Sequence, residues 1–276
     1  MSNRAEKLKL AKLLLKNEQE FDTLFSSMEK HTHFVLFRNL AFAEDPVFNH
    51  FLVNDSILEG ETSDETLLRI IEEIKKLSAT LGFRTTVFLE NIWKKAPQFE
   101  RLAIGQGFKI SEKMEILSKN LDPKNVLPPS PGISVSETKD FEAWNRIFVS
   151  SFQIPSSWCG ELISREKEIV GNESVTLFLA KESSRVEPQG CLLSFVFPPE
   201  LMGIYCVGTE PRSRGRGIAR ALMSFAEEKA RKIGCSRMTL QTVTSDGVSP
   251  MYKKMGYVTE FDRNILWSPL SGLGPK

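Results

Sequence analysis

Alternating arginines and glycines at residues 212–217, Arg-Ser-Arg-Gly-Arg-Gly, have the types and spacing of a phosphate-binding turn. An apolar stretch, 201–208, runs into the turn and an amphipathic pattern begins at Ile218, which predicts a strand before the turn and a helix after it. Glycines at such a junction leave backbone N–H groups unpaired at the helix start, where the helix dipole favours an anion. Arg212, Arg214 and Arg216 add positive charge. The segment is therefore predicted to hold a pyrophosphate.

Two other phosphate-binding patterns fit this turn poorly. A Walker A loop requires G-x-x-x-x-G-K-[ST], which does not occur in the sequence. The dinucleotide fingerprint G-x-G-x-x-G/A begins with Gly215 and Gly217, but Arg220 stands at its third position. No acidic residue follows at the end of the next predicted strand, where Gln241 and Thr242 stand. A dinucleotide oxidoreductase is therefore the most distant alternative.

A second motif lies downstream, at residues 249–257, Ser-Pro-Met-Tyr-Lys-Lys-Met-Gly-Tyr. It places Tyr252 four residues before the Gly256-Tyr257 pair. Together with Arg212-x-x-Gly215-x-Gly217, it resembles the two signatures of the GNAT superfamily of N-acetyltransferases. These are Q/R-x-x-G-x-G/A and a Leu-Tyr pair four residues before Gly-Phe. The resemblance covers about residues 133–267 and implies that the anion is the pyrophosphate of acetyl-CoA.

The resemblance implies a role for each matching residue. Backbone N–H groups of residues 214–219 would bind the pyrophosphate, and the backbone of Val207 and Thr209 would pair with the pantetheine arm like an added strand. The Val207 N–H would polarise the thioester carbonyl, and the Tyr252 hydroxyl would protonate the coenzyme A sulfur. The implied cofactor-binding set is Val207, Thr209, Arg212, Arg214, Gly215, Arg216, Gly217, Ile218, Ala219, Ser245 and Tyr252, with Val207 and Tyr252 catalytic and no metal.

Some features of the site depart from the family pattern. Residues 202–204, Met-Gly-Ile, offer no carboxylate where many family members carry the general base, and Glu210 is expected to be a surface-loop residue. Gly208 is expected to mark the bulge that opens the strand. Ser245 stands where the family often has Asn. The acceptor would be selected by two helices that include residues 158–161, which do not identify a substrate.

The elements around these motifs are expected in the order β-α-α-β-β-β-α-β-α-β, which matches the family fold. Apolar periodicity and turn residues delimit each of them. The expected strands are 133–137, 174–181, 190–197, 201–207, 237–243 and 257–267, and the expected helices are 141–152, 156–170, 218–233 and 249–255.

The clearest break in the chain is a group of four prolines between residues 123 and 131. Such a segment continues neither a helix nor a central strand, so it indicates a linker. The predicted division is a degenerate GNAT-like domain at 1–121, the linker at 122–132 and the acetyltransferase domain at 133–276. The expected fold class is α/β (α+β), with two tandem GNAT-like domains, each a twisted, mixed, mostly antiparallel sheet flanked by helices.

The first half contains a weaker copy of the second. Aligning Gly82 with Gly234 places a helix at 66–81 and a strand at 83–89 over their counterparts in the second half. At this alignment Ser63 and Glu65 stand in place of the two turn glycines, and acidic side chains there would repel a pyrophosphate. The N-terminal half is therefore predicted to have a structural or substrate-gating role.

The amino-acid composition narrows the kinds of protein and of binding partner that remain. A net charge of +1 with 41% hydrophobic and 26% charged residues is typical of a globular protein and predicts neither nucleic acid nor a membrane as partner. The basic N-terminus is interleaved with leucines, which indicates an amphipathic helix rather than a signal peptide. Widely spaced cysteines without a CxxC motif indicate reduced thiols and so a cytoplasmic protein. A monomer or homodimer is expected. The cysteines are Cys159, Cys191, Cys206 and Cys235.

These features together predict an acetyl-CoA-dependent N-acetyltransferase. It would transfer an acetyl group to a primary amine of a small molecule or peptide, directly in a ternary complex. The missing carboxylate at 202–204 leaves a second class open, a non-catalytic acyl-CoA-binding sensor or scaffold.

Overall fold

The computed structural model describes residues 2–43, 45–122, 124 and 126–268, and its strands form one mixed sheet of eleven. The strands are β1 (Ser27–Lys30), β2 (Phe34–Arg38), β3 (His50–Val53), β4 (Thr85–Glu90), β5 (Lys109–Asn120), β6 (Ile133–Thr138), β7 (Val175–Glu182), β8 (Gly190–Val196), β9 (Leu201–Thr209), β10 (Arg237–Val243) and β11 (Val258–Ser268). Their order across the sheet is β1-β2-β3-β4-β11-β5-β10-β9-β8-β7-β6.

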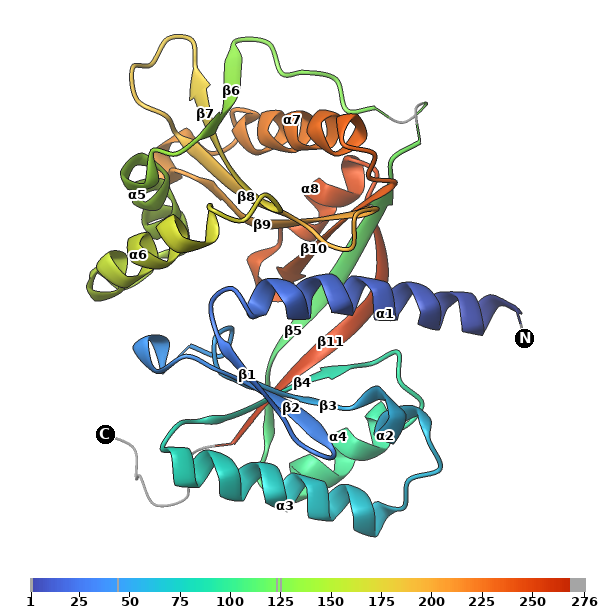
Figure 1. The fold of residues 1–276 in the computed structure, drawn as a ribbon. Coiled ribbons are helices and arrows are strands. Elements are labelled where there is room, and N and C mark those ends of the chain that lie inside the picture. The colour runs from blue at the N-terminus through green and yellow to red at the C-terminus, as the bar shows by residue number, and fades with distance from the viewer. Residues whose placement is uncertain (1, 44, 123, 125, 269–276) are drawn as a thin grey trace.

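Helices flank this sheet at both of its ends (Figure 1). They are α1 (Ser2–Asp22), α2 (Asp55–Glu59), α3 (Asp64–Leu81), α4 (Ala96–Gly105), α5 (Phe141–Phe152), α6 (Cys159–Ile169), α7 (Ile218–Lys232) and α8 (Ser249–Lys254), with short 3-10 turns η1 (Leu40–Phe42), η2 (Ser156–Trp158), η3 (Pro211–Ser213) and η4 (Thr244–Asp246). The predicted fold class and element order are confirmed. None of the described helices has the length and apolar character needed to cross a membrane.

The two halves repeat a parallel strand–helix–strand unit. In the second half α7 joins β9 to its parallel neighbour β10, and in the first half α3 joins β3 to its parallel neighbour β4. Gly82 and Gly234, the residues that the alignment pairs, both have positive φ just after their helices, 76° and 86°. Glycine takes this conformation without the cost of a Cβ, which is why both helices end there.

The halves exchange their last strands, a feature that the sequence does not predict. β11, the last strand of the chain, pairs antiparallel with β4, and β5 pairs antiparallel with β10. β5 and β11 also pair with each other, and this long ribbon runs from one half of the molecule to the other (Figure 1). The sheet is therefore continuous between the two halves.

Apolar side chains divide the interior into separate clusters. In the second half, α7 and α8 cover one face of the sheet, with Leu222 and Tyr252 in the same cluster as Leu192 of β8. Helices α5 and α6 cover the other face, where Trp144 and Ile169 pack with Cys191. Buried residues of α1, α3 and α4 form the cluster of the first half together with β2, β3 and β4. Each face of the second half is thus covered by its own pair of helices.

Helix α1 belongs to both halves. Its Leu14 packs in the cluster of the first half, whereas Phe21 joins the α5–α6 cluster of the second. Between them Asn17 donates from Nδ2 to the Phe197 carbonyl oxygen at 2.6 Å and accepts from the Tyr205 hydroxyl at 2.8 Å. The N-terminal helix is therefore part of the acetyltransferase half as well as of its own.

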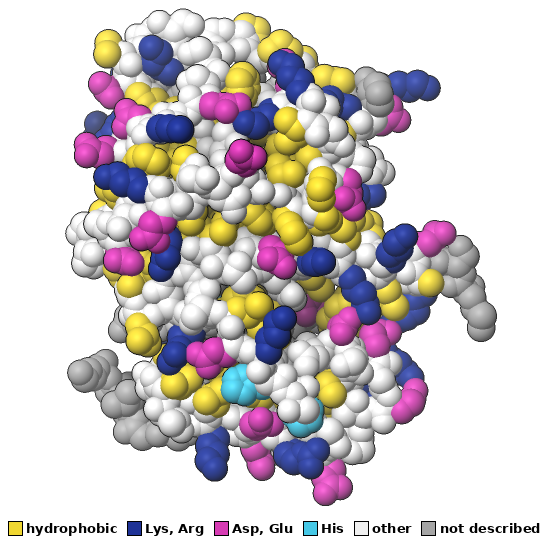
Figure 2. Space-filling model, viewed as in Figure 1, with side chains coloured by type: hydrophobic (Ala, Val, Ile, Leu, Met, Phe, Trp, Pro, Cys, Tyr) yellow, Lys and Arg dark blue, Asp and Glu magenta, His cyan; other side chains and the backbone are white. Residues whose placement is uncertain are grey.

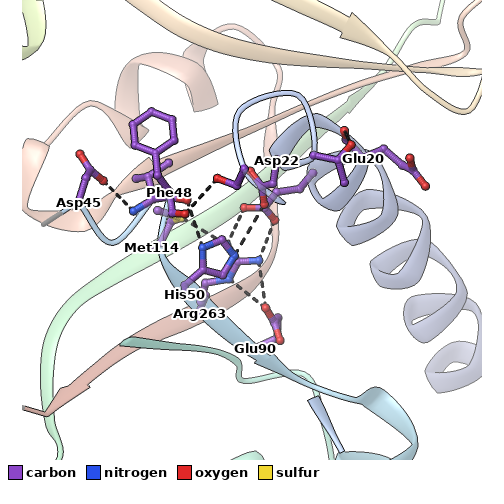
Figure 3. A network of polar contacts seen from close by, with 12 residues as sticks. Glu20, Asp22, Asp45, Phe48, His50, Glu90, Met114 and Arg263 are labelled. Atoms are coloured by element: carbon purple, nitrogen blue, oxygen red, sulfur yellow. Dashed lines mark hydrogen bonds and ion pairs between the residues drawn. The ribbon is translucent and has the colours of Figure 1, made fainter. Parts of the chain in front are cut away.

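A buried polar network fastens α1 to the exchanged strand (Figure 3). Arg263 of β11 is 1% exposed and donates from both terminal nitrogens to the Glu18 carboxylate, at 2.6 and 2.7 Å. Its Nε donates to Glu90 of β4 at 3.0 Å. His50 lies 3.8 Å from Asp22, and burial lowers its pKa to about 3, so the ring stays neutral.

Candidate functional site

The gap between β9 and β10 is the centre of the candidate site. The two parallel strands pair only at Arg237–Leu201, Met238–Met202 and Thr239–Gly203. Within the described ranges 201–209 and 237–243 no later residue of either strand pairs with the other, although both strands continue. The free edge of β9 can therefore hydrogen-bond an extended ligand in the place of a neighbouring strand.

A bulge interrupts β9 at the open part of this gap. Tyr205 pairs with Leu193 and Gly208 with Cys191, so one residue of β8 stands opposite Cys206 and Val207. Cys206 has φ of 54°, which is unusual for a residue other than glycine. Val207 has no register partner on β8 or on β10, and the structure describes every residue of these strands. Val207 therefore stands at the irregular part of β9 that borders the open gap.

The prediction that Gly208 marks this bulge is wrong. Gly208 is in regular register, and the irregular residues are Cys206 and Val207. Glycine is needed at 208 for space, because a Cβ there would lie 2.8 Å from the Cys191 sulfur and 2.9 Å from the Ser151 hydroxyl oxygen. The close approach is to α5, which covers this strand.

The turn before α7 presents unpaired backbone amides. Gly215 and Gly217 have φ of 76° and 87°, and Gly217 caps the helix without a side-chain hydrogen bond. For the amides of residues 215–220, all described, no intramolecular acceptor is found. The corresponding helix α3 differs: the Ser63 hydroxyl accepts from the Thr66 amide, and Asp64 and Glu65 occupy its first turn. Of these two helix starts, the one at α7 therefore has the character of an anion site.

The arginines of the turn divide into two kinds. Arg214 donates to the Ser151 carbonyl oxygen at 2.9 Å, and Arg216 pairs with Glu182 of β7 at 2.8 Å. These two hold the turn against neighbouring elements. Arg212 and Arg220 have no polar partner among the described residues. Arg220, which the sequence analysis did not select, thus joins Arg212 as positive charge still available to a ligand.

Tyr252 lies on the α7 side of the gap. It is 7% exposed, and its ring meets that of Tyr257 edge-on at 6.0 Å. Val207 packs against the same side-chain cluster. Burial raises the pKa of the Tyr252 phenol above its ordinary value, so the group is protonated at neutral pH. No described residue hydrogen-bonds its hydroxyl, which is free to donate to a ligand.

The remaining selected residues have structural contacts of their own. The Ser245 hydroxyl donates to Glu112 of β5 at 2.6 Å and so is engaged within the protein. Thr209 pairs with Gly190 at the end of β9, and Ile218 is buried where α7 begins. Ala219 is half-buried in the first turn of the helix, next to the unpaired amides. Glu210 pairs with Arg146 at 2.8 Å, as suits a surface-loop residue.

The opposite face of the gap is covered by helices that the sequence did not bring together. Phe21 of α1 stacks on Tyr205 with ring centroids 3.6 Å apart. Gly203 leaves room for the packing of α1 on β9, because a Cβ there would lie 2.6 Å from Tyr205 Cε2 and closer still to Asn17 Oδ1. No local pattern relates α1 to β9. Gly203, a glycine within a buried strand, was the one signal of a close approach.

Comparisons with known proteins agree with this geometry. Residues 141–257 match the model of the Acetyltransferase (GNAT) family. An acetyltransferase of Yersinia enterocolitica and one of Yersinia pestis are each 39% identical over 57 residues. The matched part is 20% of this chain and 40% of each relative, so the chain spans less than half the length of the curated relatives it matches.

Solved structures resemble the whole chain. A GCN5-related N-acetyltransferase from Kribbella flavida has a TM-score of 0.69 at 15% identity, over 96% of both chains. One from Sphaerobacter thermophilus has a TM-score of 0.69 at 15% identity, over 88% of this chain and 82% of that one. A tandem GNAT protein from the clavulanic acid biosynthesis pathway has a TM-score of 0.59 at 12% identity, over 88% of this chain and 82% of that one. Residues 141–257 therefore resemble a GNAT acetyltransferase domain, and the fold of the whole chain is similar to that of these solved structures.

Proposed function

We propose that this protein is an acetyl-CoA-dependent N-acetyltransferase that acetylates a primary amine directly, in a ternary complex. The observation that carries the proposal is the meeting of two features at the end of β9. The strand edge from Ile204 to Thr209 is open toward β10, and the amides of residues 215–220 are unpaired at the start of α7. The first suits the pantetheine arm and the second the pyrophosphate.

In the proposed reaction the Val207 amide polarises the thioester carbonyl and Tyr252 gives a proton to the departing sulfur. The Val207 amide suits this role because the bulge leaves it without a cross-strand partner. A donor fixed by the fold before the reaction needs no reorganisation when charge develops on the oxygen. The cofactor-binding set predicted from the sequence is kept, with Arg220 added as a phosphate contact and Ser245 as its weakest member.

We propose that the working unit is residues 133–276, joined through 122–132 to a unit of 1–121 that binds no acetyl-CoA. Ser63 already caps α3, and Asp64 and Glu65 would repel a phosphate. The first unit instead shapes the acceptor side through α1. Four free thiols and the use of acetyl-CoA both suit a cytoplasmic location.

An acyl-CoA sensor is the second candidate, favoured by one observation. The β9 segment 202–204 carries no carboxylate, and its Gly203 is occupied by the contact with Asn17. Release of free coenzyme A thiol separates the two functions. The assay uses acetyl-CoA with polyamines, aminoglycosides, amino acids, peptide N-termini and lysine peptides. An enzyme releases thiol with at least one amine, whereas binding of acetyl-CoA without release with any of them supports the sensor.

Tyr252→Phe is expected to lower kcat by about 10²–10³-fold, because it removes the general acid while preserving the ring. Affinity for acetyl-CoA should change less than about threefold, since a proton donor acts in the transition state rather than in binding. Tyr257→Phe is the matched control: it removes a hydroxyl whose contact is the Met238 sulfur at 3.8 Å. Equal rates for wild type and Tyr252→Phe would reject the role of Tyr252.

A further inference from the structure

Glu166 is a buried carboxylate with one oxygen left unused. It lies on α6, is 2% exposed, and accepts from Asn145 of α5 at 3.0 Å through Oε1. Its Oε2 and the Asn145 Oδ1 are buried and have no hydrogen-bond partner among the described residues. A buried acceptor without a donor is costly, so such an oxygen calls for a function.

The carboxylate lies on the side of the sheet under the bulge of β9, because Trp144, the neighbour of its partner Asn145, donates from Nε1 at 3.1 Å to the carbonyl oxygen of Leu192, the β8 residue opposite the bulge. Its charge raises the pKa of the Cys206 thiol, after the larger effect of burial, and contributes in the same direction at Cys191. Cys206 is the residue directly before Val207, whose amide is the proposed donor to the thioester carbonyl. The contact with Asn145 thus places Glu166 on the α5–α6 side of the sheet, at the level of the bulge.

The two sides of the gap differ in chemistry. Val207 and Tyr252 belong to the cluster under α7, whereas Cys191 and Cys206 belong to the cluster under α5 and α6. Tyr252 on the α7 face, as the acid, and the Glu166 carboxylate on the α5–α6 face would then lie on opposite sides of the thioester. This is the arrangement that acyl transfer needs, because the amine and the departing sulfur occupy different positions around the carbonyl carbon.

We propose that Glu166 is the general base of the acetyl transfer and that the acceptor amine binds against α5 and α6 with its nitrogen at Glu166 Oε2. This inference rests on the proposed function. As the nitrogen–carbon bond forms, one proton passes from the amine to Glu166. The carbon–sulfur bond breaks, and the sulfur takes its proton from Tyr252. A proton passed from Glu166 to the Tyr252 phenolate through solvent restores both groups.

The electrical surroundings of Glu166 suit a base. Burial raises its pKa to about 8, and the hydrogen bond from Asn145 acts in the opposite direction. The titratable groups that face it are the thiols of Cys191 and Cys206, and no charged side chain of the described residues contributes to the shift. A base whose pKa lies near the working pH is deprotonated in a good share of the molecules and is still basic enough to take a proton from the amine. Glu18, by contrast, is held by both terminal nitrogens of Arg263.

The test is Glu166→Gln, measured by thiol release with an amine that the wild-type protein acetylates. We expect kcat/KM to fall by about 10²–10³-fold. The wild-type profile of kcat/KM should rise with pH through about 8, because the base acts only when deprotonated. That rise should be absent in the variant, and any rise that remains belongs to the amine itself. Glu166→Asp, which keeps a carboxylate, should retain the rise at a reduced rate and provides a second test if the glutamine variant does not fold.

Glu168→Gln on the same helix is the control, because its exposed carboxylate only pairs with Arg165 at 2.8 Å. It should match wild type. Unchanged rate and pH profile in Glu166→Gln, with normal acetyl-CoA binding, would overturn the role of Glu166 but leave the proposed function intact. Wild-type protein that acetylates no amine would instead overturn both. A variant that fails to bind acetyl-CoA at all would also contradict a role confined to the base.

Discussion

Arg263→Met is expected to lower the free energy of unfolding by about 3–5 kcal/mol, the typical cost of removing one partner of a buried ion pair. The guanidinium is 1% exposed and serves two carboxylates at once, Glu18 on α1 and Glu90 on β4 (Figure 3). It also stacks over Phe88 at 4.8 Å. Methionine fills part of the volume but leaves two buried carboxylates without a cation. Urea unfolding of the full chain at pH 7 measures the loss.

The matched control is Arg165→Met, which breaks an exposed pair with Glu168 and should cost less than about 1 kcal/mol. Adding Glu18→Gln and Glu90→Gln to Arg263→Met should restore part of the stability, because the stranded charges are removed. The single variant should also recover stability as the pH falls. Burial raises the pKa of Glu90 and the Arg263 charge opposes that shift, so loss of the cation should raise this folded-state pKa further, and a carboxyl group of that kind destabilises the fold as pH rises. Equal losses for Arg263→Met and Arg165→Met would show that the buried network adds no more stability than an exposed ion pair.

Gly217→Asp is expected to weaken acetyl-CoA binding by at least about 100-fold, equivalent to about 3 kcal/mol. The aspartate would place a negative charge at the open helix start, next to the amides assigned to the pyrophosphate. Like charges a few ångströms apart repel by several kcal/mol at the dielectric of a protein surface. The fold should survive, because an acidic residue at a helix N-terminus is favourable.

Gly217→Asn separates charge from shape in this experiment. Asparagine has the size of aspartate and tolerates the φ of 87° at this position. It should cost about tenfold in affinity or less, through the space its side chain occupies and the strain at positive φ. Calorimetric titration of both variants measures the difference. Equal weakening by Asp and Asn would show that steric filling, rather than the charge of a bound phosphate, controls the site.

The surface charges on the rest of the molecule do not form a broad field that would attract an anionic ligand. The attraction is therefore local to the start of α7. On the face drawn in Figure 2, basic and acidic side chains are interspersed, with neither sign forming a continuous patch. Lys229 pairs with Glu137 and Lys253 with Glu115, so several cations are matched across elements. The affinity expected at α7 therefore comes from its amides and from Arg212 and Arg220.

Local patterns in the sequence predicted the elements well. α5 and β10 have the predicted bounds, and α7 ends one residue earlier than predicted. These elements are fixed by apolar periodicity and by capping residues a few positions away, so a short window of sequence contains the information. The apolar stretch at 201–208 and the amphipathic pattern from Ile218 placed the turn at 212–217 between β9 and α7 for the same reason.

Contacts between distant residues were not predictable in this way. The pairing of β11 with β4 brings Arg263 beside Glu90, and neither strand carries a signal that excludes pairing within its own half. The bulge at Cys206 depends on the register with β8. Asn145 and Glu166 meet because α5 and α6 pack side by side, which no spacing along the chain reveals. In each case the partners are set by tertiary packing.

Titration of the wild-type chain with acetyl-CoA in a calorimeter tests directly whether the gap beside β9 and the start of α7 bind this cofactor. We expect one binding site per chain, no binding of NAD, and loss of the acetyl-CoA signal in Gly217→Asp. One site is expected because α7 begins with unpaired amides, whereas Ser63 caps α3. No binding of acetyl-CoA, or binding that Gly217→Asp leaves unchanged, would contradict this assignment.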